Sequence, residues 1–129
     1  MPKYKVITTG VASTALALGA TLGLAGTASA ATPSSVCGSG FTVRDSSPLG
    51  EGPNARVYLL RNGSTACVVT FKTGSSVGNT VGVGAWVSVP GDRRADQGPY
   101  ATYAGPVKIN ASCVSWGGNY GEYTYKKSC

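Results

Sequence analysis

After residue 30 the sequence consists of short apolar runs separated by turn-forming residues, and this pattern limits the possible folds more than any other feature. The runs are rich in Val, Thr, Tyr and Trp, and clusters of Gly, Pro, Asn and Asp interrupt them. No stretch has the periodicity of an amphipathic helix. Seven strands are therefore predicted, over residues 41–44, 56–60, 66–72, 80–89, 100–109, 112–116 and 122–127. This spacing predicts an all-β fold, a small antiparallel β-sandwich or barrel.

Turn signals separate the predicted strands. Asn62-Gly63 is a strong hairpin signal because both residues tolerate a positive φ. Residues 45–54 and the charged stretch 90–99 are predicted to be loops, and the glycine-rich residues 117–121 are predicted to form a turn.

The alternation of side chains along a strand sorts two of the predicted strands into faces. Cys67, Val69 and Phe71 share one side of the third strand, which suits a buried cysteine. The fourth strand has a continuous apolar side and an opposite side that reads Gly82, Gly84, Trp86, Ser88. Trp86 either packs over the small residues or stands exposed as a stacking platform. Packing is the favoured interpretation, since tryptophan is usually mostly buried.

The first 30 residues have the three parts of a secretory signal peptide. Lys3 and Lys5 supply a positive start, an apolar stretch follows, and Ala28-Ser-Ala30 is a small-residue cleavage site. A membrane anchor is the weaker alternative, since the apolar stretch is short and diluted by Gly and Thr. Cleavage would leave residues 31–129 as one secreted domain, and no stretch within it is apolar for long enough to span a membrane.

In an exported protein the four cysteines are expected to form two disulfides. A zinc site is the weaker alternative, because structural zinc sites usually contain closely spaced cysteine pairs and this chain has none. Four cysteines allow three pairings. Cys37–Cys67 with Cys113–Cys129 is slightly favoured, since the second bridge would close a predicted terminal hairpin.

The residues that most enzyme mechanisms need are missing or badly placed. The sequence contains no histidine, so it has no Ser-His-Asp triad and no histidine metal ligand. Asp92 and Asp96 are the closest acidic pair, but Arg93 and Arg94 lie between them, which favours a solvated charged loop over a catalytic carboxylate pair. We expect no enzymatic activity, no catalytic residue, no metal and no cofactor.

Surface binding is the function class that the composition favours. Trp116, Tyr123 and Tyr125 are candidates for an exposed aromatic patch, although capping of a thin core is the favoured interpretation of these residues. Without the signal peptide the chain has nine basic and five acidic residues, a net charge of +4 that favours anionic wall polymers. The basic residues are scattered, which argues against nucleic acid.

The charged stretch also suggests an alternative function. Standard-mechanism protease inhibitors present a rigid exposed loop, often with a basic residue at the scissile bond. Arg93 and Arg94, between Pro90 and Pro99, loosely fit that description, so a secreted protease inhibitor is the second hypothesis.

Five short motifs resemble the spore-associated protein A family, small exported proteins of filamentous spore-forming bacteria. They are Cys37-Gly-Ser-Gly-Phe41, Val57-Tyr-Leu-Leu60, Cys67-Val-Val-Thr70, Tyr103-Ala-Gly-Pro-Val107 and Cys113-Val-Ser-Trp116. The resemblance implies export and association with the spore or hyphal surface, and it implies no enzymatic activity. The expected partners are thus cell-wall or spore-coat components, with no nucleic acid and no stable membrane insertion after signal cleavage.

Overall fold

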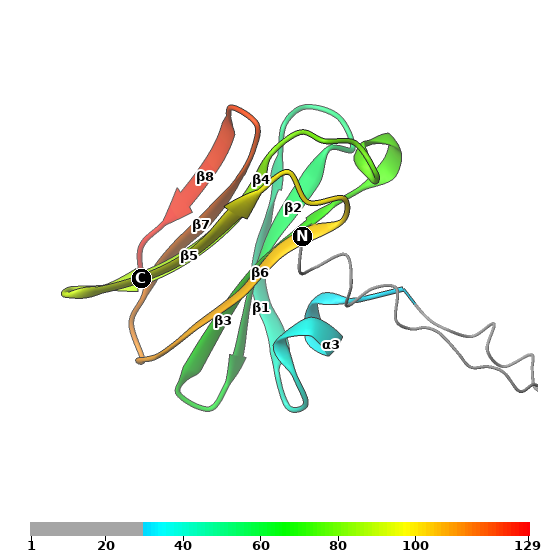
Figure 1. Cartoon of the computed structure of the whole chain (residues 1–129). Helices are drawn as coiled ribbons and strands as arrows, with labels where there is room; N and C mark the ends of the chain where they lie inside the picture. Colours follow the sequence, from blue (N-terminus) through cyan, green and yellow to red (C-terminus); the bar gives the residue numbers. More distant parts are fainter. Residues whose placement is uncertain (1–29) are drawn as a thin grey trace, which may run out of the picture. The chain divides into compact units, whose positions relative to one another are not determined.

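A computed structural model describes residues 30–129, and residues 1–29 of the predicted signal peptide lie outside that range. Residues Pro33–Cys129 form one compact unit. Within it, two antiparallel four-stranded sheets lie against each other (Figure 1). The predicted all-β sandwich is therefore confirmed.

The first sheet has the strand order β1-β2-β3-β6 and the second has the order β5-β4-β7-β8. The strands of the first are β1 (Thr42–Leu49), β2 (Ala55–Asn62), β3 (Thr65–Lys72) and β6 (Tyr103–Asn110). Those of the second are β4 (Val83–Val89), β5 (Asp92–Gly98), β7 (Ser115–Tyr120) and β8 (Tyr123–Lys127). The remaining elements are a short helix, α3 (Pro33–Cys37), and one turn of 3-10 helix, η2 (Gly74–Ser76). The predicted hairpin at Asn62-Gly63 is confirmed, since Asn62 pairs with Thr65.

The main core lies between the two sheets and follows from strand alternation. Val57 and Val68 of the first sheet and Val83 and Val87 of the second are completely buried. Full burial of a valine side chain stabilises the folded state by roughly 1.5–3 kcal/mol, so this layer is the main source of stability.

A second, smaller apolar cluster lies on the outer side of the first sheet, where α3 covers it. Cys37 of α3 forms a disulfide with Cys67 of β3, with a Cα–Cα distance of 6.1 Å. Leu60, Val69 and Tyr103 are buried in the same cluster. The first sheet is therefore covered on both faces, which explains why β3 is apolar on both sides.

Residues 90–99 are not the loop that the sequence predicted. They form the short turn at Pro90-Gly91 and then β5, which pairs with β4 from Val89↔Asp92 to Val83↔Gly98. The residues of β5 have low strand propensity, so propensity alone missed it. Pairing with the apolar β4 through a tight turn, in which Gly91 has φ +87°, imposes the extended conformation.

Two further predicted boundaries were wrong. The glycine-rich segment 117–121 is mostly strand, because β7 continues to Tyr120 and the turn follows at Gly121. At Gly118 a Cβ would lie only 3.0 Å from Val57 of the opposing sheet, so glycine here marks close approach of the sheets. Similarly, β1 continues to Leu49 through Pro48, which an edge strand tolerates.

Candidate functional site

The three aromatic residues predicted to form a surface patch face the sandwich interior. Trp116 on β7 is only 3% exposed, and its ring centroid lies 5.5 Å from that of Tyr125. The register of β7 and β8 directs Trp116, Tyr123 and Tyr125 to the side that faces the first sheet. Tyr123, at the edge, is 48% exposed. Because Trp116 is a core residue, the predicted three-residue patch is wrong, and the alternative that these residues cap the core describes them better.

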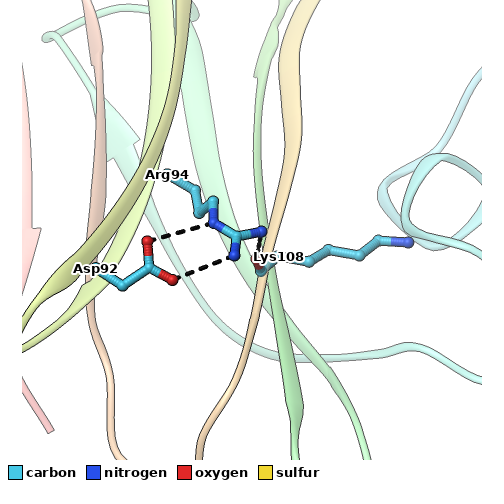
Figure 2. A network of polar contacts seen from close by, with 3 residues as sticks. All are labelled: Asp92, Arg94 and Lys108. Carbon is cyan, nitrogen blue, oxygen red and sulfur yellow. Dashed lines mark hydrogen bonds and ion pairs between the residues drawn. The ribbon is translucent and has the colours of Figure 1, made fainter.

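Arg93 and Arg94 project from opposite faces of β5, because they are consecutive residues in a strand. Arg94 points toward β6. Its guanidinium donates hydrogen bonds to both carboxylate oxygens of Asp92, with an ion-pair distance of 3.2 Å, and to the main-chain oxygen of Lys108 at 3.4 Å (Figure 2). The Lys108 side chain extends away from this pair (Figure 2).

Asp96 strengthens the same junction between the two sheets. One carboxylate oxygen accepts a 2.6 Å hydrogen bond from the Tyr100 hydroxyl, and the other accepts a 2.9 Å hydrogen bond from the main-chain N–H of Gly105 in β6. Of the two residues weighed above as a catalytic pair, Asp92 pairs with Arg94 of the same strand and Asp96 ties β5 to β6.

Arg93 projects from the outer face of the second sheet and lies over Trp86. Its guanidinium carbon is 4.5 Å from the centroid of the Trp86 ring, a cation–π geometry. Within residues 30–129 the Arg93 guanidinium forms no hydrogen bond, so its N–H donors remain available. Trp86 itself is partly exposed.

Two glycines make room for the Trp86 ring and for the amide side chains beside it. At Gly117 on β7, a Cβ would lie 2.8 Å from the Trp86 ring. At Gly84 on β4, a Cβ would collide with the side-chain oxygens of Gln97 and Asn119. The Trp86 ring and the side chains of Gln97 and Asn119 therefore pack directly against the main chain of the second sheet. This agrees with one part of the favoured interpretation, that Trp86 folds over glycine, although it does so on the outer face.

We call this surface the tryptophan face and define it by six residues from four strands. They are Gly84, Trp86, Arg93, Gln97, Asn119 and Lys126. Strand alternation directs two charged side chains to this face from β4, β5, β7 and β8, those of Arg93 and Lys126, and both are basic and exposed.

A hollow of about 340 Å³ adjoins the tryptophan face at the end near the Pro90 turn. It is lined by Ser88, Val89, Pro90, Cys113, Val114 and Ser115. Ser88 pairs with both Arg93 and Ser115 across the sheet, so the hollow begins at the residue directly opposite Arg93.

The perturbed titratable groups lie elsewhere in the domain. Burial lowers the pKa of Lys72, whose ammonium donates hydrogen bonds to the main-chain and side-chain oxygens of Asn79 at 2.7 and 2.9 Å. Asn79 in turn donates to the Tyr120 hydroxyl at 2.8 Å, so Lys72 joins the first sheet to the second. Burial raises the pKa of Tyr103. These groups stabilise the sandwich and face no open site.

The cysteines form the slightly favoured pairing. Besides Cys37–Cys67, a disulfide joins Cys113 to Cys129, with a Cα–Cα distance of 5.5 Å. No cysteine is left free in the described residues. Over the same range, no cluster of three metal-ligating side chains occurs, and no helix is long and apolar enough to cross a membrane.

The sequence reasoning missed Gln97, Asn119 and Lys126 as surface partners of Trp86. The alternation Gly82, Gly84, Trp86, Ser88 had already marked the face of β4. Its neighbours were hidden because β5 was predicted to be a loop and the end of β7 a turn, so no strand register linked them to Trp86.

One curated protein shows clear sequence similarity. The chain is 36% identical over 107 residues to "Spore-associated protein A" of Streptomyces coelicolor. The match covers 73% of this chain and 64% of that protein, so the chain spans less than two thirds of its relative's length. No family model and no solved structure matches the chain. The resemblance to the spore-associated protein A family that the sequence motifs indicated is therefore confirmed.

Proposed function

We propose that the chain is an exported, non-enzymatic protein that attaches to the surface of spores or hyphae. The observation that carries this proposal is the 36% identity to a protein whose name describes it as spore-associated. The N-terminal signal pattern, with its basic start and its Ala28-Ser-Ala30 cleavage site, supports export.

The construction of the domain also suits an extracellular role. Two disulfides fasten both ends of the described chain, one through α3 and one through the C-terminal residue. Disulfides persist in oxidising compartments and are rare in the bacterial cytosol. They give a small domain stability that its modest core does not supply alone.

The test is fractionation of a culture of the producing bacterium into medium, hyphal wall and spores. Mass spectrometry would then identify the N-terminus and the disulfides of the protein in each fraction. A chain that starts at Ala31, carries both bridges and is enriched on spores or walls is the expected result. Protein found mainly in the medium would contradict surface attachment, and protein retained in the cytosol with residues 1–30 intact would contradict export. An unrelated secreted protein with no affinity for walls serves as the control.

A further inference from the structure

The outer faces of the two sheets differ in one respect that points to a ligand. The outer face of the first sheet is covered by α3 and fastened by Cys37–Cys67. On the outer face of the second sheet, Arg93, Gln97 and Lys126 are exposed. We infer that this tryptophan face binds an acidic polysaccharide, with the sugar rings beside Trp86 and the carboxylate groups paired with Arg93 and Lys126. The inference deepens the proposed surface attachment and rests on it.

The first argument is the state of Arg93. Its contact with the Trp86 ring holds the guanidinium in place, so less side-chain entropy is lost when a ligand binds. Its N–H donors have no hydrogen-bond partner within the described residues. An oriented guanidinium with free donors matches the planar, two-oxygen geometry of a carboxylate.

The second argument is the contrast with Arg94, which has the same chemistry one residue later. Arg94 is neutralised by Asp92 and donates to the Lys108 carbonyl oxygen, so its donors serve the fold. Arg93 has no acidic neighbour on its face. Of two adjacent arginines, the one on the open face is the one without a counterion.

The third argument is the charge of the whole face. Arg93 and Lys126 are the charged side chains that the four strands direct there, and no acidic side chain accompanies them. The five acidic residues after residue 30 are at positions 45, 51, 92, 96 and 122; none occupies a strand position of this face, and Glu122 lies in the turn before β8. Charge complementarity therefore selects an anionic ligand and disfavours a basic one.

The fourth argument concerns the sugar rings. The Arg93 guanidinium lies over the Trp86 ring, and the part of the indole that stays exposed beside it is apolar surface for the C–H groups of a sugar. Gln97 and Asn119 flank Gly84 and carry amide groups that both donate and accept, which suits hydroxyl groups. A face built of an aromatic ring, planar amides and arginine combines the groups needed for an acidic sugar.

The shape of the face favours a chain over a single sugar. From Gly84 to Ser88 the surface follows β4 for roughly 14 Å, given about 3.4 Å per strand residue. The 340 Å³ hollow beside Ser88 and Ser115 continues this strip beyond Trp86. A linear polymer could therefore lie along β4 and extend into the hollow beside Ser88.

The test uses the full chain secreted by a bacterial host and two defined polymers, polygalacturonate and neutral dextran of similar length. Binding is measured by affinity electrophoresis and by tryptophan fluorescence. The chain has two tryptophans, and since Trp116 is 3% exposed, a ligand at the surface changes mainly the emission of Trp86. Three variants are compared with wild type: Arg93→Glu with Lys126→Glu, Trp86→Ala, and the control Arg44→Glu with Lys108→Glu, which changes the net charge equally through exposed residues of the first sheet.

Wild type is expected to bind polygalacturonate and not dextran, with a change in tryptophan emission. The tryptophan-face double variant is expected to lose affinity by at least about tenfold, given the usual strength of charge-assisted hydrogen bonds. Trp86→Ala should lose affinity by a similar factor, because it removes both the sugar contact and the ring that orients Arg93. The control double variant should stay within about threefold of wild type, since exposed charges far from the ligand are screened.

Three outcomes would overturn the inference: no binding of polygalacturonate, equal binding of dextran, or an equal loss of affinity in the control double variant. The last result would mean diffuse attraction by net charge. Circular dichroism of each variant separates loss of binding from loss of fold, and the charge variants remain informative if Trp86→Ala fails to fold. Because the assay uses purified protein and a defined polymer, it can fail while fractionation still finds the protein on spores, so the two proposals fail separately.

Discussion

The ammonium of Lys127 lies 2.6 Å from a carboxylate oxygen of Asp45, and this ion pair joins the two sheets at their edges. Lys127 ends β8, the outermost strand of the second sheet, and Asp45 lies in β1, the outermost strand of the first. On the opposite side of the sandwich, β5 contacts β6 through the hydrogen bonds of Arg94 and Asp96. Polar contacts therefore hold together both open sides of the sandwich.

The first prediction concerns stability in acid. The hydrogen bond from Lys127 is the largest cause that lowers the pKa of Asp45 below 3.8. Since the folded-state pKa is the lower one, the contribution of Asp45 is fully present above pH 3.8 and is lost as pH falls through the folded-state value. Asp45→Asn should thus lower stability at pH 6, and the difference from wild type should shrink progressively as the pH falls below 3.8. Urea unfolding across this range measures the effect.

A difference between wild type and Asp45→Asn that stays constant as the pH is lowered from 6 into the acid unfolding range would contradict this account of the ion pair. Ser47→Ala is a suitable control on the same strand, since it changes a polar residue without changing charge. Its effect should not depend on pH.

The second prediction concerns Gly117, whose main chain packs against the Trp86 ring. A Cβ at Gly117 would overlap the main-chain oxygen of Tyr125 and lie 2.8 Å from the Trp86 ring. Gly117→Ala should therefore destabilise the fold by about 1–3 kcal/mol, the usual cost of overpacking, and shift the tryptophan emission. Gly52→Ala is the control, because a Cβ there meets nothing within 4 Å. Equal stability of the two variants in thermal unfolding would show that β7 does not approach β8 and Trp86 so closely.

The third prediction concerns the order in which the disulfides are reduced. Cys37 and Cys67 are 1% and 0% exposed, whereas Cys113 and Cys129 are both exposed. A thiol reagent must reach a sulfur atom to attack it, so Cys113–Cys129 should be reduced first under native conditions. Brief treatment, alkylation and mass spectrometry would identify the modified pair. Alkylation of Cys37 and Cys67 at equal speed would contradict the covering role of α3.

The fourth prediction concerns the protease-inhibitor hypothesis. Arg93 and Arg94 lie in β5, which is paired with β4 along its whole length, and Arg94 is further tied to Asp92. A protease needs an unpaired extended segment to enter its cleft. We therefore expect trypsin to keep its activity in the presence of a molar excess of the folded protein. A stoichiometric loss of trypsin activity that Arg93→Ala or Arg94→Ala abolishes would revive the hypothesis.

The sequence was sufficient for the fold class and for the residues of the second and third strands. The alternation in residues 66–72 correctly placed Cys67 and Val69 on one buried side, and the hairpin at Asn62-Gly63 followed from turn chemistry. The family resemblance was also predicted from the sequence, and the 36% identity to a curated spore-associated protein confirms it.

The sequence could not say which side of a strand faces the core. Tyr123 and Tyr125 do share a face, as alternation required, but that face turned out to be the inner one. Trp86 shares its side of β4 with Gly84, and Trp116 shares its side of β7 with Gly118, so a glycine on the same side does not by itself distinguish the exposed tryptophan from the buried one. The tertiary packing of β7 against the first sheet decides it, and no short-range signal carries that information.

The most direct test of the account is sedimentation of the purified protein with spores of the producing bacterium at physiological salt. Wild type and the Arg44→Glu, Lys108→Glu control should sediment with the spores, and the Arg93→Glu, Lys126→Glu variant should remain in the supernatant. This result would show that the protein attaches to spores and that the tryptophan face makes the contact. If wild type stays in solution, surface attachment is wrong, and if all three proteins sediment alike, the tryptophan face is not the binding surface.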